Sequence, residues 1–233
     1  MIIDTDKIKD SVKGHIKNSI STGVIDNVKN SIPDYSQAVD WMNKVIEGDA
    51  GSYSLFLDWA YNKAVNAEIT GVDSASNIAL EYRAKNKTIE EAADALINDY
   101  WKKTGMVGAL TGVGGLGTLP INLVGSTVLQ LRMAAAVAIL GGWNLEDARV
   151  KKALILCALG CKAVNSLSSK VLEMAVRKGA IKFAEKGIAK GIPLVSVLVS
   201  GAIDAAATKA IGNVAKKCFI TEVPLALTAP AED

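Results

Sequence analysis

Residues 112–117 read Gly-Val-Gly-Gly-Leu-Gly and have the glycine spacing of a dinucleotide-binding loop. In such a loop the glycines follow a buried strand and open a helix, and an acidic residue about 20 positions later binds the ribose hydroxyls. Here a helical pattern precedes the glycines, and no Asp or Glu occurs between Asp99 and Glu146. No Gly-Lys-Ser or Gly-Lys-Thr phosphate loop follows either. We therefore expect no bound nucleotide and no other cofactor.

Two other residue types could support catalysis or metal binding. His15 is the only histidine, and it falls on the charged face of the first predicted helix, where we expect a solvated side chain and not a general base. Cys157 and Cys161 share one predicted helical face, at a spacing that could hold two metal ligands. No further Cys or His accompanies them nearby, and buried cysteines behave as small apolar side chains. The sequence predicts no metal site and no catalytic residue.

Two isolated charges lie in otherwise uncharged helical stretches. Arg132 interrupts an uncharged run over residues 104–145, and Asp204 follows another over residues 191–203. A single charge buried without a partner is costly, so we expect Arg132 and Asp204 to face each other or a polar cavity, with Gln130 beside them. The alternatives are a ligand pocket in which Arg132 binds a phosphate or carboxylate, and ordinary exposure to solvent.

A band of basic residues follows the long predicted helix over residues 163–190, with apolar side chains on the opposite face. Such a helix is either an ordinary solvated surface helix or a contact for anionic lipid headgroups, where each basic group adds about 1 kcal/mol. The candidate headgroup contacts are Lys170, Arg177, Lys178, Lys182, Lys186 and Lys190.

The charge of the chain is distributed unevenly. Residues 1–139 contain 13 basic and 16 acidic side chains, a net charge of −3, whereas residues 140–220 contain 13 basic and 5 acidic side chains, a net charge of +8. This asymmetry favours an anionic surface as the partner. Nucleic acid is not the expected surface, because the basic region offers few aromatic side chains for base stacking.

Apolar residues recur with the helical period along almost the whole chain, and no segment shows the alternation of a strand. A composition that is 50% hydrophobic but only 5% aromatic favours closely packed helices. We expect capping boxes at Asp34 with Gln37 and at Thr88 with Glu91, and an N-cap at Asp147. The sequence predicts an all-α fold, a multi-helix bundle.

The 28 residues from Thr104 to Leu131 carry no formal charge and include seven glycines and Pro120. A transmembrane helix needs about 20 apolar residues without strong breakers, so a simple span is not expected here. We expect a central glycine-rich helical hairpin that either packs among other helices or dips into one leaflet of a membrane. Its candidate lipid contacts are Gly112, Gly114, Gly115, Leu116 and Leu119.

Several short motifs follow one another in a recognisable order. They are residues 112–120, 129–132, 141–145, 158–160 and 192–195, followed by Gly201, Asp204, Thr208, Gly212 and Phe219. In order and spacing they resemble the EcsC protein family over about residues 88–220, which implies a glycine-rich helical core there. Residues 1–87 would then be an N-terminal helical extension or cap. Residues 221–233, which have two prolines and no helical period, are expected to be a disordered tail.

Two positions depart from the family pattern. Ser196 stands where the family usually has glycine, and Asp204 stands where it often has asparagine. At position 204 this chain therefore has a carboxylate in place of the amide of the family pattern. The family's namesake is encoded beside an ABC transporter, but the family has no established activity that could be carried over.

The uncharged segment and the basic half predict a non-enzymatic protein that associates peripherally with an anionic membrane surface or with a membrane protein. Three cysteines and no secretion signal indicate a reducing compartment, on the cytoplasmic side of the membrane or in the cytoplasm. One alternative is a soluble helical interaction module in which residues 105–141 are a buried hairpin. The other is an enzyme acting on a lipid or another small ligand, with Ser166, Ser168 or Ser169 as nucleophile. The oligomeric state stays open.

Overall fold

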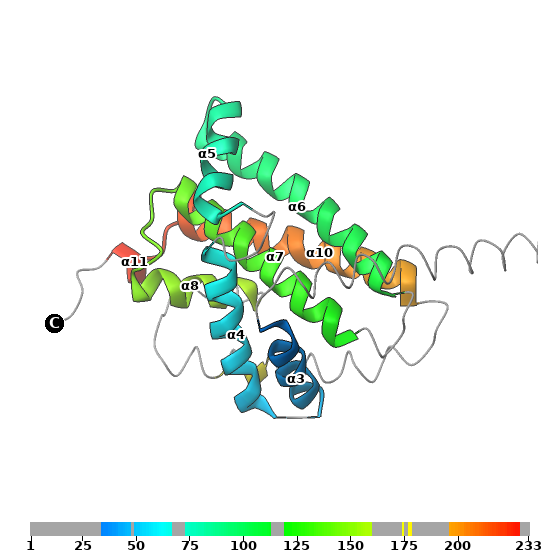
Figure 1. Ribbon diagram of the computed structural model, residues 1–233. Helices are drawn as coiled ribbons and strands as arrows, with labels where there is room; N and C mark the ends of the chain where they lie inside the picture. Colours follow the sequence, from blue (N-terminus) through cyan, green and yellow to red (C-terminus); the bar gives the residue numbers. More distant parts are fainter. Residues whose placement is uncertain are drawn as a thin grey trace, which may run out of the picture.

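The computed structural model describes residues 34–47, 49–66, 73–112, 119–159, 174, 177–178 and 196–228. Within these ranges every regular element is a helix and none is a strand, so the predicted all-α fold is confirmed (Figure 1). The elements are α3 (Tyr35–Ile46), α4 (Ala50–Val65), α5 (Ala75–Lys85), α6 (Ile89–Gly112), α7 (Leu119–Leu140), α8 (Ala148–Ala158), α10 (Ser196–Lys216), the π-helical turn η2 (Lys217–Thr221) and α11 (Leu225–Thr228). The first predicted helix and most of the one predicted at 163–190 lie outside the described residues.

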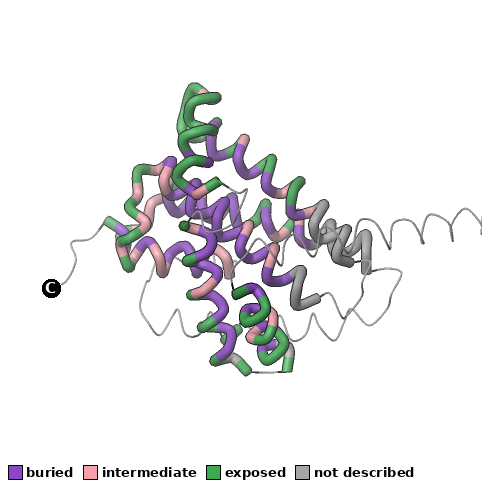
Figure 2. Tube along the Cα trace, in the orientation of Figure 1, coloured by how far each residue is buried: buried purple, intermediate pink, exposed green. Residues whose placement is uncertain are grey.

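Helix α7 is the centre of the bundle. It contacts α3, α4, α5, α6, α8 and α10, and Figure 2 shows it buried along most of its described length. Its sequence explains this burial, because Arg132 is its only charged residue and apolar side chains surround the helix. One side of α7 packs with α3 and α4 in a cluster that includes Phe56 and Leu131. The other side packs with α5, α6, α8 and α10 in a larger cluster that includes Leu96 and Met133.

Three long helices, α6, α7 and α10, run side by side, and contacts along their length give their directions. Helices α6 and α10 are antiparallel, because Asp94 pairs with Lys216 and Thr104 bonds Thr208 further along. Helices α7 and α10 are parallel, because Gln130 bonds Thr208 and the carboxyl end of α7 meets η2. Helices α6 and α7 therefore form a hairpin, but its first helix begins well before the predicted uncharged hairpin over residues 105–141 and carries charged side chains along its first part. The carboxyl end of α6 and the amino ends of α7 and α10 lie together (Figure 1).

The two ends of this three-helix unit differ in charge. Residues 105–112 of α6, 119–122 of α7 and 196–203 of α10 carry no formal charge, and we call them the uncharged end. The opposite end comprises the start of α6, the start of α8, the end of α10 with η2, and α11. It contains several ion pairs, and we call it the charged end.

The helix caps test the local predictions. At the start of α6, Thr88 Oγ1 accepts the N–H of Glu91 at 3.1 Å, and the Glu91 carboxylate accepts the N–H of Thr88 at 3.1 Å, so this capping box is confirmed. Asp147 caps α8 as predicted and accepts a backbone N–H at 2.8 Å. The box predicted at Asp34 with Gln37 is wrong, because Asp34 has a left-handed φ of 61° and its side chain forms no cap hydrogen bond. A capping side chain needs an extended backbone to reach the free N–H groups.

The residues that follow α7 join it to η2. Gly142 has a φ of 84°, and the left-handed turn it makes brings the N–H of Trp143 to the carbonyl oxygen of Ala138 at 3.0 Å. A Cβ on Gly141 would lie 2.3 Å from the carbonyl oxygen of Phe219, so a larger residue does not fit there. The indole N–H of Trp143 donates to the same carbonyl oxygen at 2.8 Å. These contacts fix the end of α7 against the end of α10.

The core extends beyond the two boundaries that the sequence predicts for it. Helices α3 and α4 belong to the expected N-terminal extension, yet Phe56 shares a core cluster with Leu131 of α7. Residues 225–228 were expected in a disordered tail, but they form α11, and Leu227 is buried. The prediction of disorder is wrong there because an apolar side chain has found a place in the core. Residues 229–233 lie outside the described part of the chain.

Candidate functional site

Arg132 is completely buried, and its side chain reaches from α7 to the end of α4. Its Nε donates to the carbonyl oxygen of Ala64 at 3.1 Å, and its Nη2 donates to that of Lys63 at 2.7 Å. Both carbonyls belong to the last turn of α4, where carbonyl groups lack partners within the helix and the helix dipole is negative. Arg132 therefore caps α4 and joins it to α7.

Burial governs the electrostatics of Arg132. Desolvation lowers the pKa of its guanidinium, and the nearby Tyr100 and Asp73 oppose that shift. Burial also raises the pKa of Tyr100 to about 12, and here Arg132 acts in the opposite direction. Among the described residues no carboxylate forms an ion pair with Arg132, and its Nη1 has no hydrogen-bond partner. The two carbonyl oxygens at the negative end of α4 accept the hydrogen bonds of this buried charge.

The predicted pair of Arg132 with Asp204 is wrong. Both residues are buried, as expected for single charges in apolar helices, but Arg132 bonds to α4 whereas Asp204 lies on α10. Gln130, predicted beside Arg132, is two residues earlier on α7 and is therefore about 200° away around the helix. A pocket that contains Arg132 together with Gln130 and Asp204 does not form, because α7 itself separates them.

A second polar cluster joins α6, α7 and α10 on the other side of α7. Thr208 Oγ1 donates to the carbonyl oxygen of Asp204 at 2.8 Å and accepts from Nε2 of Gln130 at 3.1 Å. Thr104 Oγ1 lies 2.8 Å from the same hydroxyl oxygen. Thr104 Oγ1 also lies 3.0 Å from the carbonyl oxygen of Tyr100, and each hydroxyl has one proton, so the two threonines share two protons among each other and the carbonyl oxygens of Tyr100 and Asp204. All five residues are buried.

This polar cluster is a structural contact between helices. The hydroxyl of Thr208 already lies within hydrogen-bond distance of Asp204, Gln130 and Thr104 of the protein itself. Sliding one helix past the others would leave buried polar groups unpaired, so the cluster fixes the register of all three. Sequence reasoning singled out Gln130 and Asp204 as site residues, but it named Thr208 only as a motif residue and gave Thr104 no role. The available signal was their position, since Thr104 opens the uncharged run and Thr208 lies one helical turn after Asp204.

The uncharged end contains two of the predicted lipid contacts. Gly112 is the last residue of α6, and Leu119 is the first residue of α7. Gly114, Gly115 and Leu116 belong to the connection between these two helices and lie outside the described residues. The tip of the hairpin is therefore built from uncharged sequence on both of its helices.

One helix in the described part of the chain, Leu123–Leu140, is long and apolar enough to cross a membrane by length and composition. In the structure 78% of this stretch is buried inside the protein. A core helix has the same length and composition, so this observation is weak support for a span. The stretch serves as the core of the bundle.

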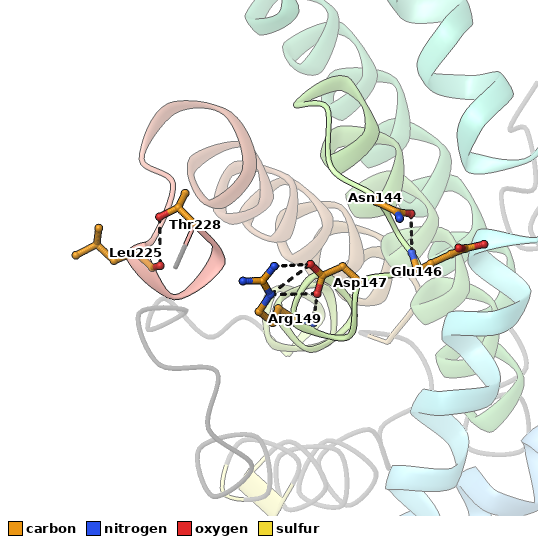
Figure 3. A network of polar contacts seen from close by, with 6 residues as sticks. All are labelled: Asn144, Glu146, Asp147, Arg149, Leu225 and Thr228. Atoms are coloured by element: carbon orange, nitrogen blue, oxygen red, sulfur yellow. Dashed lines mark hydrogen bonds and ion pairs between the residues drawn. The ribbon is translucent and has the colours of Figure 1, made fainter. Parts of the chain in front are cut away.

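The charged end is held by ion pairs and helix caps. Asp147 Oδ2 lies 2.8 Å from Nη2 of Arg149, and Nε of Arg149 donates to the same carboxylate (Figure 3). Hydrogen bonds from Arg149 hold the pKa of Asp147 below its usual range. Figure 3 also shows α11 beside this pair, with Thr228 Oγ1 donating to the carbonyl oxygen of Leu225 at 3.2 Å. Polar side chains here are paired with one another at the surface.

The remaining predicted site residues lie mostly outside the described part of the chain. Arg177 and Lys178 are described and are exposed to solvent. Cys157 is buried, as expected for a small apolar side chain, and no group of three metal-ligating side chains occurs among the described residues. Outside the described residues lie His15, Cys161, Ser166, Ser168, Ser169, Lys170, Lys182, Lys186 and Lys190.

Comparison with known proteins finds no matching family model, no matching curated protein and no matching solved structure. The resemblance to the EcsC family stays a prediction. The structure does assign physical roles to several of the motif residues. Gly141 and Trp143 meet the carbonyl oxygen of Phe219, and a Cβ on Gly212 would lie 2.7 Å from the Ile97 side chain where α10 crosses α6. These motif positions are places where two helices approach closely.

Proposed function

We propose that this protein is a non-enzymatic helical protein that associates peripherally with an anionic membrane surface on the cytoplasmic side. The observation that carries the proposal is the convergence of three helix ends without formal charge at one end of the bundle, opposite an end with ion pairs. A molecule polarised in this way can bring its uncharged end to an apolar surface while its charged end stays in water.

The charge of the carboxyl-terminal half supports an anionic partner. Residues 140–220 carry a net charge of +8, and Arg177 and Lys178 are exposed. Each basic group close to an anionic membrane adds about 1 kcal/mol, so several of them together give reversible binding that salt weakens. A membrane protein such as a transporter lies among the same headgroups and is the alternative partner within this proposal.

Co-sedimentation of the full chain with lipid vesicles tests the proposal. Vesicles of phosphatidylcholine alone are compared with vesicles that also contain phosphatidylglycerol, each across a salt series. We expect binding to the anionic vesicles that decreases as salt rises, and weak binding to the neutral ones. Binding that ignores both lipid charge and salt contradicts the electrostatic part of the proposal.

A charge placed in the sequence that connects α6 with α7 sharpens this test. Leu116→Asp adds a carboxylate to this uncharged connection and makes transfer toward lipid costly, so we expect binding to anionic vesicles to fall about tenfold or more. Leu80→Asp is the matched control, because Leu80 lies on α5 and is 67% exposed. Circular dichroism shows whether both variants fold. Equal binding by the two variants counts against this uncharged connection as the contact.

A soluble helical interaction module is the second candidate, and the burial of Leu123–Leu140 favours it. In this case the uncharged region is simply the core hairpin, and the chain stays in the supernatant with every vesicle. An enzyme acting on lipid or a small ligand ranks last. Its proposed nucleophiles Ser166, Ser168 and Ser169 lie outside the described residues, and it gains support only if an activity is found that a Ser→Ala scan removes.

A further inference from the structure

Three side chains border the uncharged end where α6 and α10 lie side by side. Trp101 and Lys102 are on α6, and Lys209 is on α10 with its Nζ 5.8 Å from the centre of the Trp101 ring. Lys102 and Lys209 are exposed, and Trp101 is half-buried. We call these three residues the Trp101 rim.

On α6 and α10 the first exposed charges beyond the uncharged end are lysines, and two of them, Lys102 and Lys209, belong to the rim. On α10 the first charged residue, Asp204, is buried, and the next is Lys209. On α7 the first charged residue, Arg132, is also buried. On α6 the uncharged run ends directly at Lys103 and Lys102. The exposed charge next to the uncharged end is therefore cationic on both helices that present one.

Lys103 differs from the other two lysines in its surroundings. Its Nζ lies over the ring of Tyr100, 5.0 Å from the ring centre. The carboxylate of Glu81 on α5 has its pKa lowered mainly by Lys85, and Lys103 adds a smaller attraction. Asp99 also acts on Glu81 and accepts a hydrogen bond from Tyr82, so this side of α6 holds acidic groups. Lys103 is partly balanced within the protein, whereas Lys102 and Lys209 flank Trp101.

We propose that the Trp101 rim binds the phosphate groups of anionic phospholipids and sets the depth to which the uncharged end enters the membrane. This inference rests on the proposed membrane association. Trp combines an apolar ring with an N–H donor and settles at the boundary between lipid and water, and lysine extends its aliphatic stem along apolar surface while its ammonium group reaches the headgroups. The order along α6, with Trp and Lys directly before an uncharged segment, matches that boundary.

The indole N–H of Trp101 adds a specific expectation. In the described part of the structure this group is covered and has no acceptor. If the half-buried ring turns outward, its N–H can donate to a phosphate or ester oxygen of the lipid. This movement breaks no hydrogen bond, because the N–H has no acceptor within the described structure. Trp101→Phe keeps the ring and removes this donor.

Charge reversal at the rim, with a matched reversal at the charged end, tests the inference. The double variant Lys102→Glu with Lys209→Glu is compared with Lys87→Glu with Lys217→Glu, which changes the net charge equally at two exposed positions of the charged end. Both full-length proteins are sedimented with phosphatidylcholine vesicles that contain phosphatidylglycerol. We expect roughly a tenfold or greater loss of binding for the rim variant and a much smaller loss for its control.

The outcomes separate this inference from the proposed function. If the wild-type chain binds no vesicle, the proposed function fails and the rim fails with it. If the wild type binds and the two double variants lose affinity equally or not at all, membrane association stands and the rim is overturned. Quenching of tryptophan fluorescence by brominated lipid gives an independent reading. We expect Trp101→Phe to lose most of that quenching, and unchanged quenching overturns the rim as the boundary.

Discussion

The two ends of the three-helix unit are built on different principles. At the charged end, Gly141 and Trp143 lock α7 to the carbonyl oxygen of Phe219, and ion pairs such as that of Lys216 with Asp94 cross between helices. At the uncharged end, three helix ends meet without a single formal charge. Specific polar contacts thus determine the packing at one end, while the sequence of the other has no ionic group with which to make such contacts.

This difference indicates how stability and binding are divided along the bundle. Arg132 and the cluster around Thr208 lie between the two ends and hold α4, α6, α7 and α10 in register. These contacts at the centre, with the ion pairs of the charged end, specify how the described helices pack. We therefore expect substitutions at the centre and the charged end to change the free energy of unfolding, and substitutions at the uncharged end to change binding.

Arg132→Ala is expected to have the largest effect on folding. It removes the cap of α4, leaves the carbonyls of Lys63 and Ala64 without their donor, and opens a cavity, so we expect a loss of about 3–5 kcal/mol in the free energy of unfolding. Arg132→Met fills most of the space without burying a charge, so its free energy of unfolding should decrease less than that of Arg132→Ala. Urea denaturation measures both. A loss below about 1 kcal/mol for the alanine variant contradicts the capping role.

Two glycines of the α7 region sharpen the comparison between the ends. Gly141→Ala forces a Cβ against the Phe219 carbonyl and should destabilise the protein by about 1–3 kcal/mol. Gly125→Ala lies toward the uncharged end, where a Cβ would meet nothing within 4 Å, and should stabilise the helix by about 0.5–1 kcal/mol. Thermal unfolding gives the sign of each change. The same sign for both would remove the distinction between the two positions.

Thr208→Val tests the polar cluster at the centre. Valine has nearly the same shape but no hydroxyl, so Gln130 and Thr104 lose their shared acceptor and we expect a loss of about 1–3 kcal/mol. Vesicle binding should stay unchanged, because the cluster is buried. Thr104→Val should lower the free energy of unfolding less in the Thr208→Val variant than in the wild type, because its partner hydroxyl is already gone. A double-mutant cycle measures this coupling.

Asp147→Asn is expected to have the smallest effect. Its pKa is lowered in the folded state from the usual 3.8, so the carboxylate stabilises the fold above that pH and the contribution is lost as pH falls through the lowered value. The pair with Arg149 is partly exposed, so at neutral pH we expect a change of no more than about 1 kcal/mol. The free energy of unfolding, measured from neutral to acid pH, should fall less steeply for Asp147→Asn than for the wild type. If the two pH dependences are the same, the pair with Arg149 contributes nothing to stability.

Local sequence signals predicted the helices better than they predicted the site. The capping box of Thr88 with Glu91 is confirmed because both partners lie within one helical turn. The box at Asp34 failed because the backbone there is left-handed, which residue type alone does not reveal. The burial of Arg132 and Asp204 follows from their apolar surroundings, but their pairing does not, since each found partners on a different side of α7.

The sequence by itself determined that this chain is helical, that one long stretch lacks charge and that the charges isolated within apolar helices are buried. These properties depend on neighbours within a turn or two, where the helical period and the cost of burying a charge act directly. Only the tertiary structure decided that Arg132 caps α4, that Thr104 and Thr208 join two helices and that three uncharged helix ends meet at one end of the bundle. Such contacts link residues far apart in the chain, and the packing of whole helices sets them.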